Sequence, residues 1–177
     1  MTRPTSLERD AALLELAQRY FTTRGPATIA DFAWWSGLTA ADARRGVEAA
    51  ATHLEHWSIE GRSYWFPATG RQVRISSPIA HLLPNFDEYF IGLKDRTAFG
   101  ARLNSSRVKP RATGLAGHVL AVNGQVVGAW RRTLVGKSVV IEPKPLIRLT
   151  EGERRAVGVA ARKLGRFLEL PVEIRWR

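Results

Sequence analysis

Residues 28–42 read TIADFAWWSGLTAAD and contain two threonine-led capping boxes, Thr28-x-x-Asp31 and Thr39-x-x-Asp42. In each box the threonine hydroxyl can accept a hydrogen bond from a free backbone N–H of the first helical turn. The aspartate three residues later lies beside the positive end of the helix dipole. Two short helices are therefore predicted to begin in quick succession.

A glycine separates the two boxes. Gly37 can adopt the left-handed conformation that ends a helix, so we predict helices over residues 31–36 and from 40 to about 52. A preceding helix is expected to begin at the box Thr5-x-x-Glu8 and to end at Gly25-Pro26. The two short helices have the spacing of a helix-turn-helix pair, which is typical of DNA-binding units.

The pattern then changes to short apolar alternation. Residues 57–66 place apolar side chains on two limbs that reverse at Glu60-Gly61-Arg62, so a hairpin is expected here. A hairpin at this position would be the wing of a winged helix. We predict a winged helix-turn-helix domain over residues 1–78.

The second half of the chain has the pattern of strands and one long helix. Asn123-Gly124, a strong signal for a two-residue hairpin turn, separates predicted strands over 118–122 and 125–132. The remaining elements are expected at 139–142, 146–149 and 172–176 for strands, and at about 151–169 for a helix opened by Thr150-x-x-Glu153. The predicted fold class is α+β, with a β-rich domain over residues 79–177.

The net charge of +11 points to a polyanionic partner. Residues 1–60 hold six basic and eight acidic residues, a net of −2, whereas residues 61–177 hold 21 and eight, a net of +13. We therefore expect duplex DNA to be bound mainly through backbone contacts of the second half, with help from the first. The candidate DNA-binding residues are Arg44, Arg45, the wing-tip Arg62, Arg107, Lys109, Arg111, Arg131 and Arg132.

The second helix of the pair offers few base-reading side chains. Its exposed face shows Arg44, Arg45 and Glu48 among alanines, and Glu48 lies one turn from Arg44, which it can neutralise. A solvated arginine pair on a helix that packs against another domain is an equally good interpretation. A winged helix that docks a protein partner therefore stays an alternative.

Two further features have a structural and a functional interpretation. Asp87 and Glu88 are adjacent carboxylates, but Asn85 with Glu88 forms a capping arrangement, which we favour over acid–base catalysis. The basic stretch 100–117 is interpreted as a linker or as an arm that grips phosphates.

Other chemistry finds little support in the sequence. The chain has no cysteine, which excludes disulfides and thiolate zinc sites, and His53 and His56 lack further ligands at a recognisable spacing. No cofactor or metal is expected. The start MTRPTS lacks the apolar core of a signal peptide and no run of about 20 apolar residues occurs. We expect a cytoplasmic, nucleoid-associated protein with no membrane partner.

Three ordered blocks carry a resemblance to a known family. Residues 20–38, 82–89 and 128–132 closely resemble the bacterial winged-helix family that includes the AlkZ-like DNA glycosylases. The resemblance implies a small β-barrel-like domain with a long C-terminal helix after the winged helix. It also implies DNA repair by removal of alkylated bases and unhooking of crosslinks, without a metal. This chain resembles the C-terminal portion of the family.

The family's catalytic motif, two glutamines that flank one apolar residue, is absent. The glutamines here are Gln18, Gln72 and Gln125, and no two of them are two residues apart. We therefore predict a DNA-binding protein that is not catalytic as it stands. The alternative is a base-excision glycosylase for alkylated DNA, which either uses an unrecognised water-positioning residue or is completed by a missing N-terminal portion or a partner chain.

Overall fold

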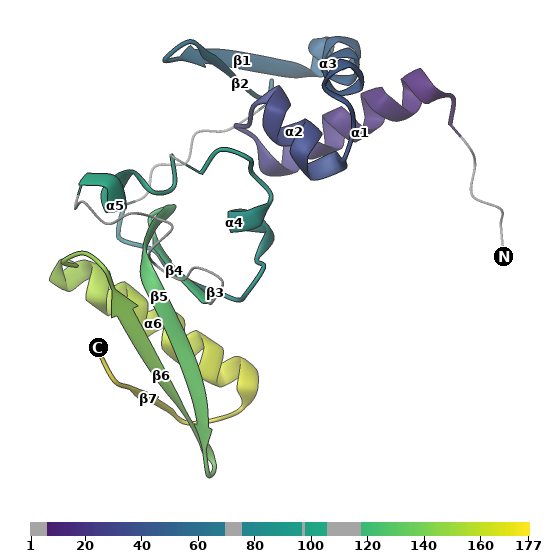
Figure 1. Cartoon of the computed structure of the whole chain (residues 1–177). Helices are drawn as coiled ribbons and strands as arrows, with labels where there is room; N and C mark the ends of the chain where they lie inside the picture. Colours follow the sequence, from purple (N-terminus) through teal and green to yellow (C-terminus); the bar gives the residue numbers. More distant parts are fainter. Residues whose placement is uncertain (1–6, 70–75, 97, 106–117) are drawn as a thin grey trace, which may run out of the picture. The chain divides into compact units, whose positions relative to one another are not determined.

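The computed structural model describes residues 7–69, 76–96, 98–105 and 118–177. The chain divides into two compact units (Figure 1). The first unit comprises Met1–Gln72 and Ile91–Asp95, and the second comprises Val73–Phe90 and Arg96–Arg177.

Three helices open the first unit, and the two expected capping boxes begin the second and third. They are α1 (Arg9–Arg24), α2 (Ile29–Ser36) and α3 (Ala40–Ala49). The hydroxyls of Thr28 and Thr39 accept from the N–H groups of Asp31 and Asp42, each at 3.1 Å. Gly37 ends α2 with a φ of 71°, as predicted.

The boundaries of α1 and α3 differ from the expectation. α1 begins at Arg9, with Glu8 at its N-cap and no side-chain capping bond, and Thr5 lies outside the described residues. α3 ends at Ala49, and a 3₁₀ turn, η1 (Ala51–His53), follows it. The chain must extend directly after this turn, because Leu54 already belongs to the next strand.

A two-stranded hairpin completes the regular structure of the first unit. Strands β1 (Leu54–Ile59) and β2 (Arg62–Pro67) pair antiparallel. Their two-residue turn, Glu60-Gly61, has φ values of 50° and 74°, the geometry that suits the right-handed twist of a hairpin.

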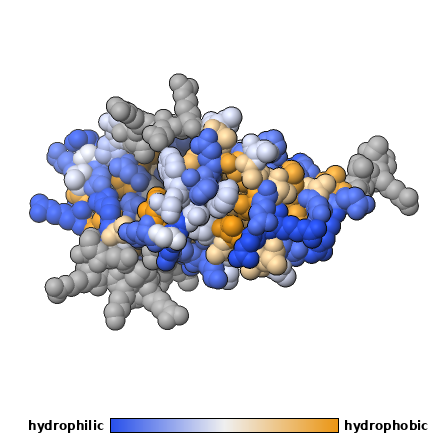
Figure 2. All heavy atoms as spheres, turned by 90° about the horizontal axis from the view of Figure 1, so that it is seen from above, coloured by the Kyte–Doolittle hydropathy of each residue, from blue (hydrophilic) through white to orange (hydrophobic). Residues whose placement is uncertain are grey.

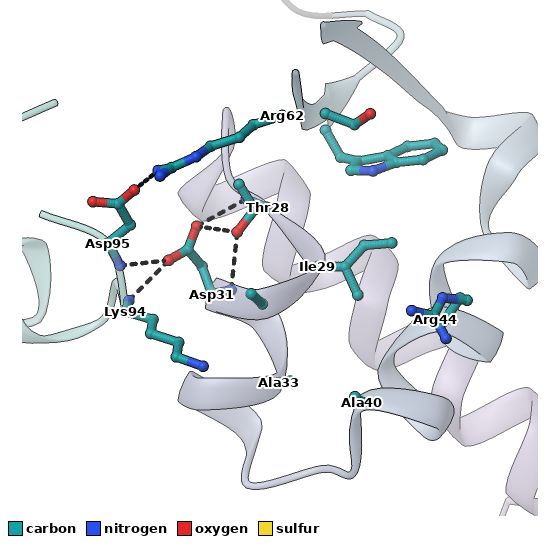
Figure 3. Close-up of a pocket in the computed structure, with 12 residues that line it drawn as sticks. Thr28, Ile29, Asp31, Ala33, Ala40, Arg44, Arg62, Lys94 and Asp95 are labelled. Atoms are coloured by element: carbon teal, nitrogen blue, oxygen red, sulfur yellow. Dashed lines mark hydrogen bonds and ion pairs between the residues drawn. The ribbon is translucent and has the colours of Figure 1, made fainter. Parts of the chain in front are cut away.

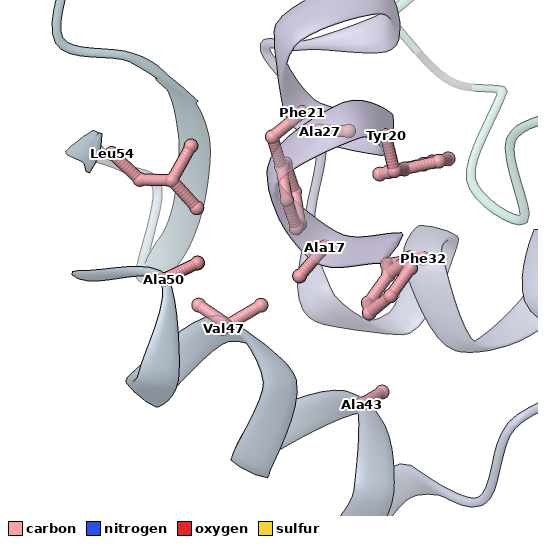
Figure 4. Close-up of a cluster of buried hydrophobic side chains, with 9 residues drawn as sticks. All are labelled: Ala17, Tyr20, Phe21, Ala27, Phe32, Ala43, Val47, Ala50 and Leu54. Carbon is pink, nitrogen blue, oxygen red and sulfur yellow. The ribbon is translucent and has the colours of Figure 1, made fainter. Parts of the chain in front are cut away.

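Aromatic rings fill the core of the first unit (Figure 4). The Tyr20 ring lies 4.9 Å from that of Phe21 and 5.0 Å from that of Phe32. Val47 packs against this cluster from α3. The apolar spacing of α1 is thereby explained, since its buried face meets α2 and α3. The buried cluster consists of Ala17, Tyr20, Phe21, Ala27, Phe32, Ala43, Val47, Ala50 and Leu54.

The second unit contains a five-stranded sheet. Its order is β3-β4-β5-β6-β7, antiparallel except for the parallel pair β6–β7. The strands are β3 (Ala80–Leu83), β4 (His118–Val122), β5 (Gln125–Val135), β6 (Ser138–Pro145) and β7 (Val172–Ile174). Within the described residues β3 and β7 are edges, so the expected barrel-like domain is a curled open sheet.

A bulge and a glycine shape the middle of this sheet. The register between β4 and β5 shifts between Leu120 and Ala121, which increases the local twist. A Cβ on Gly128 would lie 2.3 Å from the carbonyl oxygen of Lys144, so only glycine lets the β5 and β6 backbones approach this closely. Among the described residues, β5 pairs with β4 as far as Trp130 and beyond it with β6 alone.

The long C-terminal helix packs on the sheet as expected. α6 (Glu151–Leu168) opens with a reciprocal capping box between Thr150 and Glu153. Val157 and Ala161 are fully buried against the sheet. There are also two short helices, α5 (Ala101–Ser105) in the second unit and α4 (Glu88–Ile91), whose last residue already belongs to the first unit.

Two local predictions in the second half were wrong, and one strand was missed. Residues 146–149 form no strand, and β3 was not foreseen because its four residues show no clear alternation. At α4 the N–H of Tyr89 donates to Asp87 at 2.9 Å, so Asp87 serves as the cap in place of Asn85. The carboxylate of Asp87 is thereby given a structural role.

Hydrophilic and apolar side chains are interspersed on the face shown in Figure 2. Exposed large apolar residues occur in both units, among them Trp34, Trp57, Leu134 and Phe167. None of the described helices combines the length and apolar character needed to cross a membrane.

Candidate nucleic-acid interface

A pocket of about 730 Å³ opens on the first unit (Figure 3). The first turns of α2 and α3 contribute Ile29, Ala33, Ala40 and Arg44, and β2 contributes Trp65. The remaining lining residues are Thr28, Ala30, Asp31, Arg62, Ser63, Lys94 and Asp95. Two of the candidate DNA-binding residues, Arg44 and Arg62, therefore line a concave surface, and Arg45 does not.

Asp31 organises one side of this pocket. Its carboxylate is 3% exposed and accepts from the Thr28 backbone N–H at 2.9 Å and from the Thr28 hydroxyl at 2.6 Å. The other carboxylate oxygen accepts from the N–H groups of Lys94 and Asp95 at 2.8 and 3.1 Å (Figure 3). The sequence predicted the capping role of Asp31 and missed the second one, because its partners lie more than sixty residues away.

Two of the three candidate arginines in the first unit are held by carboxylates. Arg45 donates to Asp10 at 2.8 Å, and Arg62 forms an ion pair with Asp95. Arg44 has no ion pair within the described ranges, so the expected pairing with Glu48 is not formed there. The net charge available on this face is therefore small.

The second unit presents a cationic hairpin. β5 and β6 pair from Gly128 opposite Pro145 to Val135 opposite Ser138, and the tip projects beyond the neighbouring elements (Figure 1). At the tip Leu134 is 66% and Val135 51% exposed. We call residues 132–137 the hairpin tip.

Two cations flank these apolar side chains. Arg132 and Lys137 are exposed and make no ion pair with any residue that the structure describes. The sequence analysis named Arg132 and missed Lys137, Leu134 and Val135. The signal was an apolar pair directly before the turn glycine Gly136, where a soluble hairpin normally places polar residues.

Arg131 has a structural partner on the neighbouring strand. Its guanidinium forms a two-bonded ion pair with Glu142, and Arg177 donates to the same carboxylate at 2.6 Å. Glu142 is 7% exposed. The hydrogen bond from Arg131 lowers the pKa of Glu142 below its ordinary value; burial opposes this shift and Arg177 supports it. Arg131 is thus held by an ion pair, whereas its neighbour Arg132 has none among the described residues.

Another carboxylate fixes α5 to the start of α6. Arg102 donates to Glu153 at 2.7 Å. Burial alone would raise the pKa of Glu153, but hydrogen bonds from Arg102 and Thr150 outweigh it and hold the pKa below its ordinary value. Glu153 therefore acts as an anchoring anion.

Two of the histidines, His118 and His56, pack against tryptophan rings. His118 stacks on Trp130 with ring centroids 4.6 Å apart, and burial together with the charge of Arg132 lowers its pKa. His56 packs on Trp65 at 4.6 Å. No group of three or more potential metal ligands gathers in the part of the chain that the structure describes.

Helix α6 carries a second set of cations. Arg155 pairs with Glu151, and the Arg154 guanidinium lies over the ring of Trp176. Arg162, Lys163 and Arg166 form no ion pair with another described residue. The remaining candidates from the sequence, Arg107, Lys109 and Arg111, lie outside the described residues.

Comparison with known proteins identifies the family. Residues 2–167 match the family described as DNA glycosylase AlkZ-like. The chain belongs to the AlkZ-like DNA glycosylase family. Its structure is similar to that of the DNA glycosylase AlkZ of Streptomyces sahachiroi, with a TM-score of 0.69 and 25% sequence identity. The match covers 97% of this chain and 47% of the AlkZ chain, so this chain spans about half the length of that relative. No curated protein matched the chain.

The structure explains two of the sequence blocks that resemble the AlkZ-like family. In block 128–132, Gly128 permits the close β5–β6 approach and Trp130 donates from its indole N–H to the carbonyl of Leu83 at 2.9 Å. Leu83 belongs to block 82–89, so two distant blocks meet across the sheet. The architecture of the second unit thus accounts for Gly128 and Trp130 in these blocks.

Proposed function

We propose that this AlkZ-like protein binds duplex DNA through the hairpin tip of its second unit. The observation that carries the proposal is the exposed pair Leu134 and Val135 between Arg132 and Lys137. Cations at these positions can neutralise phosphates and release counterions. Apolar side chains between them can wedge against base steps in the minor groove.

The geometry of the hairpin suits this role. A two-stranded ribbon is narrow enough to enter a groove of DNA. β6 is anchored by β7 and by the core beneath α6, whereas the outer half of β5 pairs, among the described residues, with β6 only. The base of the hairpin is therefore held in place by the sheet. The tip can enter a groove of DNA without exposing buried core residues.

For the first unit we propose a winged-helix fold with a smaller share of the binding. The order of three helices and a hairpin supports this interpretation. Arg44 and the pocket residue Lys94 are cations of this unit that form no ion pair with another described residue. On this proposal residues 1–78 and 79–177 are the two domains, and the protein works on the nucleoid in the cytoplasm.

We further propose that the chain as given binds DNA without cleaving the glycosidic bond. The paired glutamines of the family resemblance are absent. Asp31, Glu142 and Glu153 are the buried carboxylates among the described residues, and each already accepts several hydrogen bonds from its surroundings. A general base needs an acceptor oxygen open to water, which these groups do not offer.

A second function, base excision on alkylated DNA, is favoured by the family membership alone. It would need residues supplied by the part of the relative that this chain does not cover, or by a partner chain. An assay for abasic sites in an alkylated duplex separates the two functions. Release of bases by this chain alone would contradict the non-catalytic proposal.

The binding proposal is tested with a fluorescent duplex, plain and alkylated, across a salt series. We expect binding that weakens steeply with salt, because counterion release drives it. Leu134→Glu should lower the affinity at least about tenfold, since a carboxylate at the tip repels phosphate and cannot wedge. Trp57→Glu is the control, an exposed apolar residue of the first hairpin. Equal loss in both variants would contradict the assignment of the tip.

A further inference from the structure

A groove of about 610 Å³ runs between α6 and β3 in the second unit. Ile79 and His81 line it on the strand side, and Val159, Lys163 and Phe167 line it on the helix side. The groove takes no part in the proposed DNA contact. It is formed entirely by residues of one unit.

The strand wall of the groove is a sheet edge. β3 pairs with β4 on one side and, within the described ranges, is the last strand of the sheet on the other. The carbonyl of Ile79 accepts from the N–H of Asn123 at 2.9 Å, which fixes the alternation of bonds along the strand. Ala80 and Leu82 therefore direct their N–H and C=O groups away from β4. Neither has a backbone partner on that side among the residues described.

The helix wall is apolar and exposed. Val159, Lys163 and Phe167 follow each other at four-residue spacing along α6, so they share one face. Phe167 is 81% and Val159 56% exposed, and Ile79 opposite is 47% exposed. Large apolar side chains gathered at one groove mark an interaction surface, whereas single exposed ones do not.

The charge of the groove-lining residues indicates which kind of ligand the groove can bind. None of its lining residues is acidic, and Lys163 forms no ion pair with any residue of the described ranges. Arg162 and Arg166 flank Lys163 on the same helix. The groove thus complements a segment with apolar side chains and a negative charge.

We propose that this groove binds an extended, acidic polypeptide segment as an added strand on β3. The segment would bond to the backbone of Ala80 and Leu82, while alternate apolar side chains contact Val159 and Phe167. An acidic side chain of the segment pairs with Lys163. DNA fits this surface less well, because a phosphate backbone offers neither a strand partner nor apolar side chains.

The test uses a fluorescein-labelled peptide of about nine residues that alternates valine and threonine and carries one central glutamate. A second peptide carries lysine in place of the glutamate. Binding to the whole chain is measured by anisotropy, and amide NMR locates the contact. We expect the glutamate peptide to bind at least about tenfold more tightly than the lysine peptide, with the amides of Ala80 and Leu82 shifted and protected from exchange.

Two matched variants decide the site. Val159→Glu should weaken the glutamate peptide at least about tenfold and leave DNA affinity unchanged, because it places a charge in the groove only. Leu134→Glu, the same change at the hairpin tip, should leave the peptide unaffected. The proposal is overturned by an absence of peptide binding at millimolar concentration, by equal loss in both variants, or by NMR shifts outside the groove. Loss of DNA affinity in Val159→Glu would also overturn it and would assign the groove to nucleic acid.

Discussion

Among the described residues, both units hold some arginines by carboxylates and leave other cations without ion pairs, but these unpaired cations lie in different places. Arg44 and Lys94 line a pocket of the first unit, whereas Arg132 and Lys137 lie at the hairpin tip of the second. In the first unit Arg9, Arg45 and Arg62 are each held by a carboxylate of the same unit. In the second unit Glu142 and Glu153 hold some arginines, but the hairpin tip keeps Arg132 and Lys137 without ion pairs in the described structure. A count of basic residues therefore does not locate an anion-binding surface, because many of these residues are already paired with carboxylates.

The carboxylates of the two units also differ in use. Asp31 links the start of α2 to the segment around Lys94 and Asp95, so it stabilises one local arrangement. Glu142 binds Arg131 of β5 and Arg177, so it also lowers the net positive charge next to the hairpin tip. A substitution of Asp31 should therefore change the stability of the protein alone, whereas a substitution of Glu142 should also change DNA binding.

The largest expected effect comes from a substitution that disrupts the β5–β6 hairpin. Gly128→Ala would place a Cβ 2.3 Å from the Lys144 carbonyl and 2.8 Å from the Cα of Pro145, both backbone atoms. Because neither can move without breaking the β5–β6 ladder, we expect a loss of about 3 kcal/mol or more in the free energy of unfolding. Urea unfolding measures it. Gly152→Ala is the control, with its nearest contact at 3.6 Å, and is expected to stay within about 0.5 kcal/mol of wild type.

A smaller effect is expected from Asp31→Ala in the first unit. The change leaves the N–H groups of Thr28, Lys94 and Asp95 without their acceptor. We expect a cost of about 2–4 kcal/mol in urea unfolding, with DNA affinity unchanged at temperatures where the protein stays folded. Asp42→Ala, the matching position of α3, should cost about 1 kcal/mol. Equal losses in the two variants would show that the hydrogen bonds from Lys94 and Asp95 to Asp31 do not contribute to the free energy of unfolding.

The smallest expected effect concerns pH. Because the folded-state pKa of Glu142 is lowered, its contribution to stability is present above the ordinary glutamate pKa and is lost as pH falls through the folded value. Glu142→Gln should lower the melting temperature at neutral pH and should make it fall less on acidification. Since Arg131 and Arg177 lose their partner, the salt dependence of DNA binding should also steepen. An unchanged pH profile would contradict this role of Glu142.

The sequence predicted best what local rules determine. The caps at Thr28, Thr39 and Thr150 and the turn at Asn123-Gly124 were all confirmed, because each depends on residues within one turn of chain. β3 and the extension of β5 beyond Arg132 were missed. Both depend on pairing with segments elsewhere in the chain, which outweighs their weak local patterns.

Charge was the least predictable part of the candidate site. Asp10, Asp95 and Glu142 pair with Arg45, Arg62 and Arg131 across separations that no spacing rule covers. The sequence could therefore count these arginines as candidates but could not tell that they are paired.

A comparison of two charge-reversal pairs tests the central claim most directly. Arg132→Glu with Lys137→Glu changes the hairpin tip, and Arg44→Glu with Arg45→Glu changes the first unit by the same charge. Affinity for one duplex is measured for both variants across a salt series. We expect the first pair to lower the slope of log affinity against log salt by about 2 and the second pair to lower it by less than about 1. Equal slopes for the two variants, or a larger loss in the second, would contradict this claim.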